Sequence, residues 1–364
     1  MRDFRSILNI IGLLLCIEAA AMLIPMFYDL YYNNHDWVQF FYSSLITFII
    51  GIILFFSFRK KNIKLGIRQA FLLTISSWLV ISLFGAIPFI YSSSSLSYTD
   101  AFFESVSGIT TTGSTVIFNL DILSEGILVW RSLLQWFGGI GIIVLAMAIL
   151  PTLQIGGMQL LHMEHDDPYE KTIPKVNRFV LELFLLYVSL SITCAILYYF
   201  SGMSGFDSVI HAMTTISTGG FSNYNESIGY FDSALIELTS IVFIILGSIP
   251  FIAYIKYLNG DKKIFLNDTQ IKTFFKIIIF SIILMFVYLS IKNQNLFETN
   301  LREVAFNVIS ILTGTGYVTQ NFSEWGSFPL MYFLILMFIG GCAGSTACGV
   351  KIFRVQILYQ FISN

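Results

Sequence analysis

Long apolar runs alternate with short polar segments along most of the chain. A helix that crosses a bilayer needs about 20 mostly apolar residues, and eight segments of the sequence satisfy this requirement. They are 6–28, 38–58, 69–91, 127–150, 178–200, 234–255, 273–291 and 329–358. The last contains a Gly-rich stretch at 340–349, which is unfavourable for a continuous helix. The pattern predicts an all-α, polytopic membrane protein whose final span is broken.

Composition excludes several other classes of protein. Of the 364 residues, 56% are hydrophobic and only 12% are charged, whereas soluble domains have about 25% charged residues. A soluble enzyme, a disordered chain and a disulfide scaffold are therefore excluded. The net charge of −2 gives no basic field for nucleic acid, and the four cysteines lack metal-ligand spacing.

The basic residues predict the orientation in the membrane. When the loops are assigned alternately to two sides, 17 of the 20 Lys and Arg residues fall on one side. The positive-inside rule makes that side cytoplasmic. We therefore predict that the protein lies in the cytoplasmic (inner) membrane and that both termini of this chain are in the cytoplasm. The loops at 29–37, 92–126, 201–233 and 292–328 are predicted outside.

An internal repeat occupies three of the outside loops. Its copies run from Asp100 to Ser114, from Asp207 to Phe221 and from Glu303 to Tyr317. Aligned on a shared glycine, each copy has an acid thirteen positions earlier and a polar side chain nine positions earlier. The glycines are Gly113, Gly220 and Gly316, and the polar side chains are Glu104, His211 and Asn307.

Each copy predicts a short helix that enters the membrane from outside and ends in a non-helical loop. About ten helical residues span roughly 15 Å, half of the apolar thickness. Non-helical backbone at that depth is tolerated only when it is buried or lines a water-filled path. Carbonyls freed from the helix suit a dehydrated cation, and glycine permits the left-handed backbone that aims them at one axis. The alternative is that these loops are ordinary turns outside the membrane. Three copies with matching positions make that alternative less favourable.

The sequence resembles the Trk/Ktr/HKT superfamily of potassium transporters, and within it the TrkH-like branch. Besides the three loops, the resemblance rests on residues 130–141, Pro151, 156–160 and 340–346. It implies an N-terminal helix hairpin followed by channel-like repeats, each made of a helix, a pore half-helix, a filter loop and a second helix. The corresponding segments are 1–60 for the hairpin, then 61–170, 171–265 and 266–364 for three repeats. The family has a fourth repeat, which we expect to be absent from this chain.

The resemblance and the backbone argument together predict a potassium filter. The predicted ligands are the carbonyls of Thr111, Thr112, Thr218, Gly219, Gly314 and Thr315, and Gly113, Gly220 and Gly316 provide the turns. By resemblance, an intramembrane gate lies at Gly340, Gly341, Gly344, Ser345, Thr346 and Gly349. A flexible kink or packing through small residues is the alternative for that stretch. Cys348 replaces a glycine usual in the family, and we expect little effect from it.

Other polar residues have less specific interpretations. His162, Glu164, His165, Asp166 and Asp167 have metal-ligand chemistry, but a solvated cytoplasmic turn explains them more simply. Ionisable groups in spans are functional candidates by default. Glu18, Glu182 and Glu237 nevertheless lie close enough to span ends to reach water or a partner. Arg131 is expected to anchor a span at the outer interface.

Potassium uptake through a gated filter is the function that the sequence favours. A membrane enzyme is disfavoured because the four histidines, His35, His162, His165 and His211, lie in different loops. The alternative is a truncated, non-conducting subunit that needs a fourth repeat from elsewhere. Apart from membrane lipid, the resemblance implies a homodimer and a separate cytoplasmic nucleotide-binding regulatory subunit. No cofactor is expected beyond the transported potassium ion.

Overall fold

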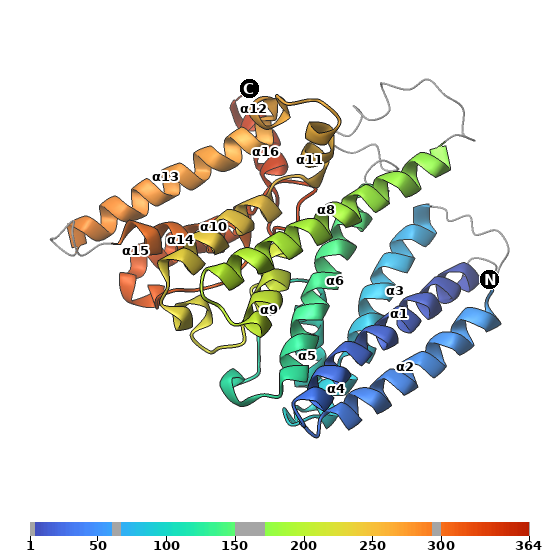
Figure 1. The fold of residues 1–364 in the computed structure, drawn as a ribbon. Helices are drawn as coiled ribbons and strands as arrows, with labels where there is room; N and C mark the ends of the chain where they lie inside the picture. The colour runs from blue at the N-terminus through green and yellow to red at the C-terminus, as the bar shows by residue number, and fades with distance from the viewer. Residues whose placement is uncertain (1–3, 60–66, 150–171, 293–299, 364) are drawn as a thin grey trace.

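The computed structural model describes residues 4–59, 67–149, 172–292 and 300–363, and every regular element in these ranges is a helix (Figure 1). The long helices are α1 (Phe4–Tyr31), α2 (Trp37–Ser57), α3 (Ile67–Gly85), α6 (Glu125–Ile149), α8 (Thr172–Phe200) and α13 (Thr269–Lys292). The shorter α-helices are α4 (Ile87–Tyr91), α5 (Tyr98–Ile109), α9 (Gly205–Ile216), α10 (Ala234–Ser248), α11 (Phe251–Leu258), α12 (Ile264–Asn267), α14 (Leu301–Thr313), α15 (Ser327–Ile339) and α16 (Ile352–Ser363). Short 3₁₀ turns are η1 (Leu120–Ile122), η4 (Ser227–Phe231) and η5 (Phe322–Trp325).

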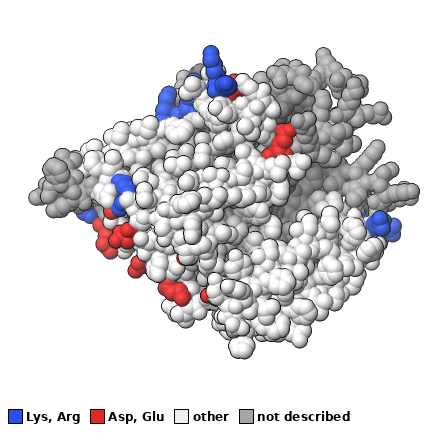
Figure 2. All heavy atoms as spheres, viewed as in Figure 1, with Lys and Arg blue, Asp and Glu red and all other residues white. Residues whose placement is uncertain are grey.

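Most of the predicted spans coincide with helices in the described residues. Five helical stretches there are long and apolar enough to cross a membrane, or up to six if one bent pair counts as a span. Helices α1, α2, α8 and α13 coincide to within a few residues with predicted spans, and α3 with α4 covers 69–91. Most of the surface seen in Figure 2 is free of Lys, Arg, Asp and Glu, which lie mainly at its margins. Such a surface suits contact with lipid.

The span predicted over 234–255 is not one continuous helix but is divided in two. Helices α10 and α11 replace it and meet at an angle of 86°. Pro250 lacks a backbone N–H, and the residue before a proline is driven out of the helical conformation. Ile249 is accordingly extended, with φ −85° and ψ 146°.

The break predicted in the last span is confirmed. Helix α15 ends at Ile339, and regular structure resumes only with α16 at Ile352. Within the break, Gly340, Gly344 and Gly349 have φ of +75°, +76° and +92°. Such left-handed backbone is readily available to glycine and incompatible with a continuous right-handed helix. The stretch that joins α15 to α16 is called the Gly-rich loop below.

Three short helices, α5, α9 and α14, begin in the same way. Ser97 and Ser204 accept a hydrogen bond from the backbone N–H of Asp100 and Asp207, and the Asn300 side chain accepts one from Arg302 N. Each capping residue also donates to the acid three positions later, at 2.7 Å. The side-chain cap satisfies one free backbone N–H of the helix, and the acid places a negative charge at the positive end of the helix. The predicted acidic helix starts are therefore confirmed.

Helices α1 and α2 form a hairpin through a close glycine contact. A Cβ on Gly12 would lie 2.5 Å from the backbone nitrogen of Phe55, and one on Gly51 would lie 2.9 Å from Cys16 Sγ. Small residues at such a crossing let two helix backbones approach. Figure 1 shows this pair at one side of the molecule and α13 to α16 at the other.

Acidic side chains join the hairpin to the next segment. Asp29 accepts a hydrogen bond from the backbone N–H of Gly126 at 2.7 Å, at the start of α6. Asp36 accepts from Ser93 N at 2.9 Å and from Ser124 Oγ at 2.8 Å. The predicted segment boundaries near 60 and 170 lie outside the described residues, and the one at 265 falls within α12.

We predict that Gly12→Ala lowers the thermal stability of the purified protein. The added methyl group would meet backbone atoms of α2, and overpacking of this kind costs about 1–3 kcal/mol. The melting temperature in detergent measures the effect. Gly205→Ala is the control, because a Cβ on Gly205 has no atom within 4 Å. Equal melting of the two variants would show that the hairpin contact is looser than described.

Candidate functional site

The three short helices end in loops with the same unusual backbone. Counted from residues 110, 217 and 313, the second and fourth residues of each loop have positive φ. The second residues are Thr111 at 56°, Thr218 at 50° and Gly314 at 76°. The fourth residues are the aligned glycines Gly113, Gly220 and Gly316, at 81°, 77° and 82°. Left-handed backbone is uncommon for threonine and costs about 1–3 kcal/mol. Its recurrence at matching positions in three loops indicates a shared backbone requirement. We call 110–114, 217–221 and 313–317 the filter loops.

The filter loops meet one another. A Cβ on Gly113 would clash with the carbonyl oxygen of Gly219 and would lie 3.6 Å from that of Thr315. A Cβ on Gly220 would clash with the Thr315 carbonyl. The structure thus brings together the three loops that contain all nine predicted filter residues. A Cβ on Gly316, in contrast, has no described atom within 4 Å, so the third loop faces open space on that side.

The polar residue nine positions before each aligned glycine fastens the chain that leaves the loop. Glu104 accepts hydrogen bonds from Thr115 Oγ1 and Val116 N, at 3.0 and 3.1 Å. The corresponding pairs are His211 Nε2 with Ser222 Oγ at 3.1 Å, and Asn307 Nδ2 with Thr319 Oγ1 at 3.0 Å. The sequence repeat showed these positions but not their role, which is to hold the outgoing chain against the short helix.

Serine side chains provide a second clamp in two of the loops. Ser107 Oγ donates to the carbonyl of Ser114 at 2.5 Å, and Ser310 Oγ donates to the carbonyl of Tyr317 at 2.7 Å. At the equivalent position of the second copy, Thr214 of α9 instead contacts the third loop, with its Oγ1 2.5 Å from the Tyr317 hydroxyl. These bonds satisfy polar groups that would otherwise be unpaired in the protein interior.

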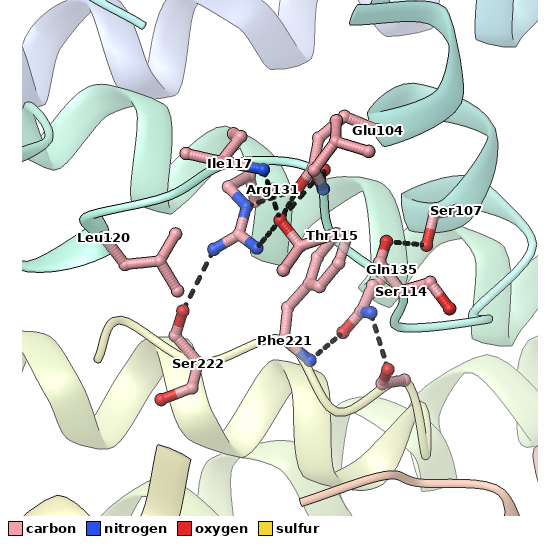
Figure 3. Close-up of polar contacts among 12 residues, drawn as sticks. Glu104, Ser107, Ser114, Thr115, Ile117, Leu120, Arg131, Gln135, Phe221 and Ser222 are labelled. Carbon is pink, nitrogen blue, oxygen red and sulfur yellow. Dashed lines mark hydrogen bonds and ion pairs between the residues drawn. The ribbon is translucent and has the colours of Figure 1, made fainter. Parts of the chain in front are cut away.

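Arg131 joins the first and second filter loops (Figure 3). Its Nε lies 2.8 Å from Glu104 Oε1, its Nη1 donates to the Ser222 carbonyl at 3.0 Å, and its Cζ lies 4.1 Å from the Phe221 ring centre. Arg131 is 1% exposed and Glu104 is fully buried. The prediction that Arg131 anchors a span at the membrane surface is therefore wrong.

Gln135, one turn further along α6, holds the second filter loop (Figure 3). Its Nε2 donates to the Gly219 carbonyl at 2.7 Å, and its Oε1 accepts from Phe221 N at 3.1 Å. Sequence reasoning missed this residue. Among the predicted ligand carbonyls, that of Gly219 is thus already hydrogen-bonded to a side chain.

The start of α9 has an additional polar cluster. Asp207 accepts hydrogen bonds from Asn223 Nδ2 at 2.7 Å and from the Tyr224 hydroxyl at 3.2 Å. Burial raises the pKa of the Tyr224 hydroxyl, and the Asp207 carboxylate raises this pKa further. Tyr224 therefore remains a hydrogen-bond donor to Asp207 at neutral pH.

The Gly-rich loop lies against the inner ends of the short helices. Thr346 Oγ1 is 2.9 Å from the carbonyls of Ile216 and Gly247, and Cys348 N donates to the Thr313 carbonyl at 2.9 Å. Ile216 and Thr313 are the last residues of α9 and α14. Thr346, one of the predicted gate residues, thus contacts the end of α9, and Cys348, two residues later, contacts the start of the third filter loop.

The remaining gate residues shape this loop. Gly341 N donates to the Cys348 carbonyl at 3.2 Å, Phe251 N donates to the Gly344 carbonyl at 2.9 Å, and Ser345 Oγ donates to the Cys342 carbonyl at 2.6 Å. A Cβ on Gly340 would clash with the Cys348 carbonyl, and one on Gly349 would lie 2.5 Å from Gly340 Cα. Glycine is therefore required where the two ends of the loop cross.

Cys348 contacts two filter loops. Its Sγ lies 3.6 Å from the Thr111 carbonyl, and its Cβ lies 2.6 Å from the position a Cβ on Gly314 would take. Lys351, which follows the loop, donates to the Ala347 carbonyl. The expectation that cysteine in place of glycine at 348 has little effect on function stays a prediction. Its side chain nevertheless lies between the Gly-rich loop and two filter loops.

Other sequence candidates do not join this site. The histidine and acid group at 162–167 lies outside the described residues, and the described ranges contain no cluster of His, Cys, Asp and Glu suited to a metal. Glu182 lies in α8. Glu237 forms an ion pair with Arg302 at 2.7 Å, as expected. Glu18 is only 6% exposed and has no hydrogen-bond partner, so the expectation that it reaches water or pairs is wrong.

Comparisons with known proteins agree with the site. The sequence model of the TrkH family, described as cation transport protein, matches residues 37–363. The chain is 36% identical to the Trk system potassium uptake protein TrkI of Halomonas elongata, covering 98% of this chain and 73% of that protein. It is 37% identical to TrkH of Escherichia coli, with 98% and 75% covered. The crystal structure of the potassium transporter TrkH from Vibrio parahaemolyticus is similar, with a TM-score of 0.89, 36% identity, and coverage of 98% of this chain and 74% of that one.

We predict that Arg131→Gln destabilises the protein by about 3–5 kcal/mol, because Glu104 would remain buried without a counter-charge. The double variant with Glu104→Gln is expected to recover part of that loss, since neither charge then remains. Melting temperatures of the single and double variants measure the coupling.

Arg68→Gln, at an exposed position on α3, is the control for loss of a positive charge and is expected to melt near the wild-type temperature. Equal losses in the Arg131 single and double variants would contradict the assigned ion pair.

Proposed function

Because this chain belongs to the TrkH family of cation transport proteins, we propose that its three filter loops line a pore for potassium uptake across the cytoplasmic membrane. The family consists of transporters and not of enzymes. The names of the relatives, which are Trk system potassium uptake proteins, support the choice of ion. They do not favour the alternative of a non-conducting subunit.

One observation supports the proposal most directly: the left-handed backbone recurs at matching positions in three loops that meet. Backbone of this kind inside an apolar region needs either internal partners or a water-filled path. The C-terminal ends of α5, α9 and α14 lead into the loops and contribute the negative ends of three helix dipoles. A dehydrated cation is the ligand that suits this arrangement.

In the proposed filter, the ion is coordinated by the carbonyls of Thr111, Thr112, Thr218, Gly219, Gly314 and Thr315. Carbonyl oxygens replace the water that potassium loses on entry. Gly113, Gly220 and Gly316 permit the turn, and glycine at all three positions is what the family resemblance associates with potassium. Gln135 must share or release the Gly219 carbonyl when an ion occupies that position.

The proposed organisation is a hairpin over 1–60 and channel-like repeats over 61–170, 171–265 and 266–364. Three filter loops from this chain leave one side of the ring open, beside Gly316. The proposal therefore includes a further element at that side, contributed by a segment or chain outside this sequence.

The Gly-rich loop is the proposed gate. Its contacts with Thr111, Thr313 and Ile216, the residue before the second filter loop, support this proposal. In the proposed orientation the loop lies on the cytoplasmic side of the filter and obstructs an ion leaving it. We further propose cytoplasmic termini, a homodimer, and a separate cytoplasmic nucleotide-binding regulatory subunit that opens the gate. The distribution of basic residues supports the orientation.

We predict that Gly220→Ser abolishes potassium-selective uptake. Its Cβ would clash with the Thr315 carbonyl and displace a predicted ligand. Rubidium uptake into cells that lack their own potassium uptake systems measures the effect.

Gly202→Ser is the matched control, because Gly202 also has positive φ, at +113°, but no atom within 4 Å of its Cβ. This control is expected to retain uptake. Absence of uptake by the wild-type chain, once it is shown to reach the membrane, would overturn the proposed pore.

We predict that Thr346→Val raises rubidium uptake several-fold, because the Gly-rich loop loses its side-chain bonds to Ile216 and Gly247. Ser345→Ala is the control, since Ser345 donates only within the loop, to the Cys342 carbonyl. Unchanged or lower uptake in the Thr346 variant would argue against a gate at this loop.

A further inference from the structure

A buried carboxylate lies near the middle of the first span and is not used by the proposed pore. Glu18 of α1 is 6% exposed, and neither of its carboxylate oxygens has a hydrogen-bond partner. No ion pair involving it is found in the described part of the chain. Glu18 therefore needs an explanation other than a structural ion pair.

A second unpartnered oxygen lies beside it. Ser105 of α5 is fully buried, and its Oγ has no hydrogen-bond partner. A Cβ on Gly85 would lie 2.7 Å from Ser105 Oγ and 3.0 Å from Glu18 Oε1, so the two oxygens are within about 6 Å of each other. Gly85, at the end of α3, keeps the space between them free of a side chain.

The charged groups on the neighbouring elements are engaged elsewhere. On α5 and α6, Glu104 pairs with Arg131, and Glu125 accepts from Asn34 Nδ2. Asp100 accepts from Ser97 Oγ, and Asp29 accepts from Gly126 N. Arg5 and Arg68 are exposed on α1 and α3, and α2 has no acidic or basic residue. None of these groups compensates a charge on Glu18.

An ionised carboxylate without a partner is strongly disfavoured in an apolar interior, whereas a neutral carboxylic acid can donate a hydrogen bond. Ser105 Oγ has no other partner, and rotation of the Glu18 side chain brings the carboxylic acid to it as a hydrogen-bond donor. We propose that Glu18 and Ser105 form a proton-binding site behind the first short helix, and that its occupancy makes potassium uptake depend on pH. The second part rests on the proposed transport function.

The site connects to the pore through α5. Two residues after Ser105 in the same helix is Ser107, whose Oγ donates to the Ser114 carbonyl in the first filter loop. Loss of the proton leaves an uncompensated charge against α5 and displaces that helix. Uptake is therefore expected to fall as the pH rises through the titration of the site.

Infrared difference spectra of the purified protein in lipid bilayers, recorded across a pH range, test proton binding without any transport. The wild-type protein is expected to show the carbonyl-stretch band of a protonated carboxylic acid, lost as the pH rises and absent in Glu18→Gln. Ser105→Ala, which keeps the carboxyl but removes its acceptor, is expected to change the frequency of the band and to shift its loss to lower pH. Identical spectra for wild type and Glu18→Gln would overturn the site.

Rubidium uptake measured at a series of pH values tests the consequence. The wild type is expected to lose uptake as the pH rises, and Glu18→Gln is expected to lose this dependence. The same pH dependence in both would overturn the regulatory part, while the spectra still decide proton binding. If the wild type transports nothing, the proposed function fails and the spectra again decide the site independently.

Discussion

Backbone groups that leave a helix inside a membrane must find partners within the protein, because lipid offers none. This constraint explains most of the polar chemistry in the structure. Three short helices end in the interior, and each following loop is held by side chains from its own helix. The chain thereby maintains non-helical backbone at a depth where it would otherwise be too costly.

The same constraint explains why the loops act together. Arg131 bonds to Glu104 of the first short helix and to the Ser222 carbonyl after the second filter loop. A buried ion pair is a weak source of net stability, but loss of one partner is costly. The pair therefore fixes the relative position of two loops more than it stabilises the fold. Gln135 adds a second link from the same helix.

Features determined by local sequence were predictable, and features that depend on distant contacts were not. Apolar runs and acidic helix starts act over a few residues, which is why most of the spans and the acidic starts of α5, α9 and α14 were predicted. Pro250 is a local signal for the bend between α10 and α11, but the length of the apolar run favoured a single span over 234–255. The partnership of Arg131 with Glu104 joins residues 27 apart in the sequence, and no local pattern indicates it. The positive φ of Thr111 and Thr218 opposes the preference of threonine, so only the tertiary contacts account for it.

Two of the carbonyls proposed to bind potassium already accept hydrogen bonds from side chains of the protein. The Gly219 carbonyl accepts from Gln135, and the Thr111 carbonyl faces the Cys348 thiol of the Gly-rich loop. A potassium ion in the filter competes with these donors for the same oxygens. If the Gly-rich loop is the gate, as we propose, its withdrawal also frees the Thr111 carbonyl to bind the ion. Under this proposal the gate and the filter are coupled, because the Thr111 carbonyl serves both of them.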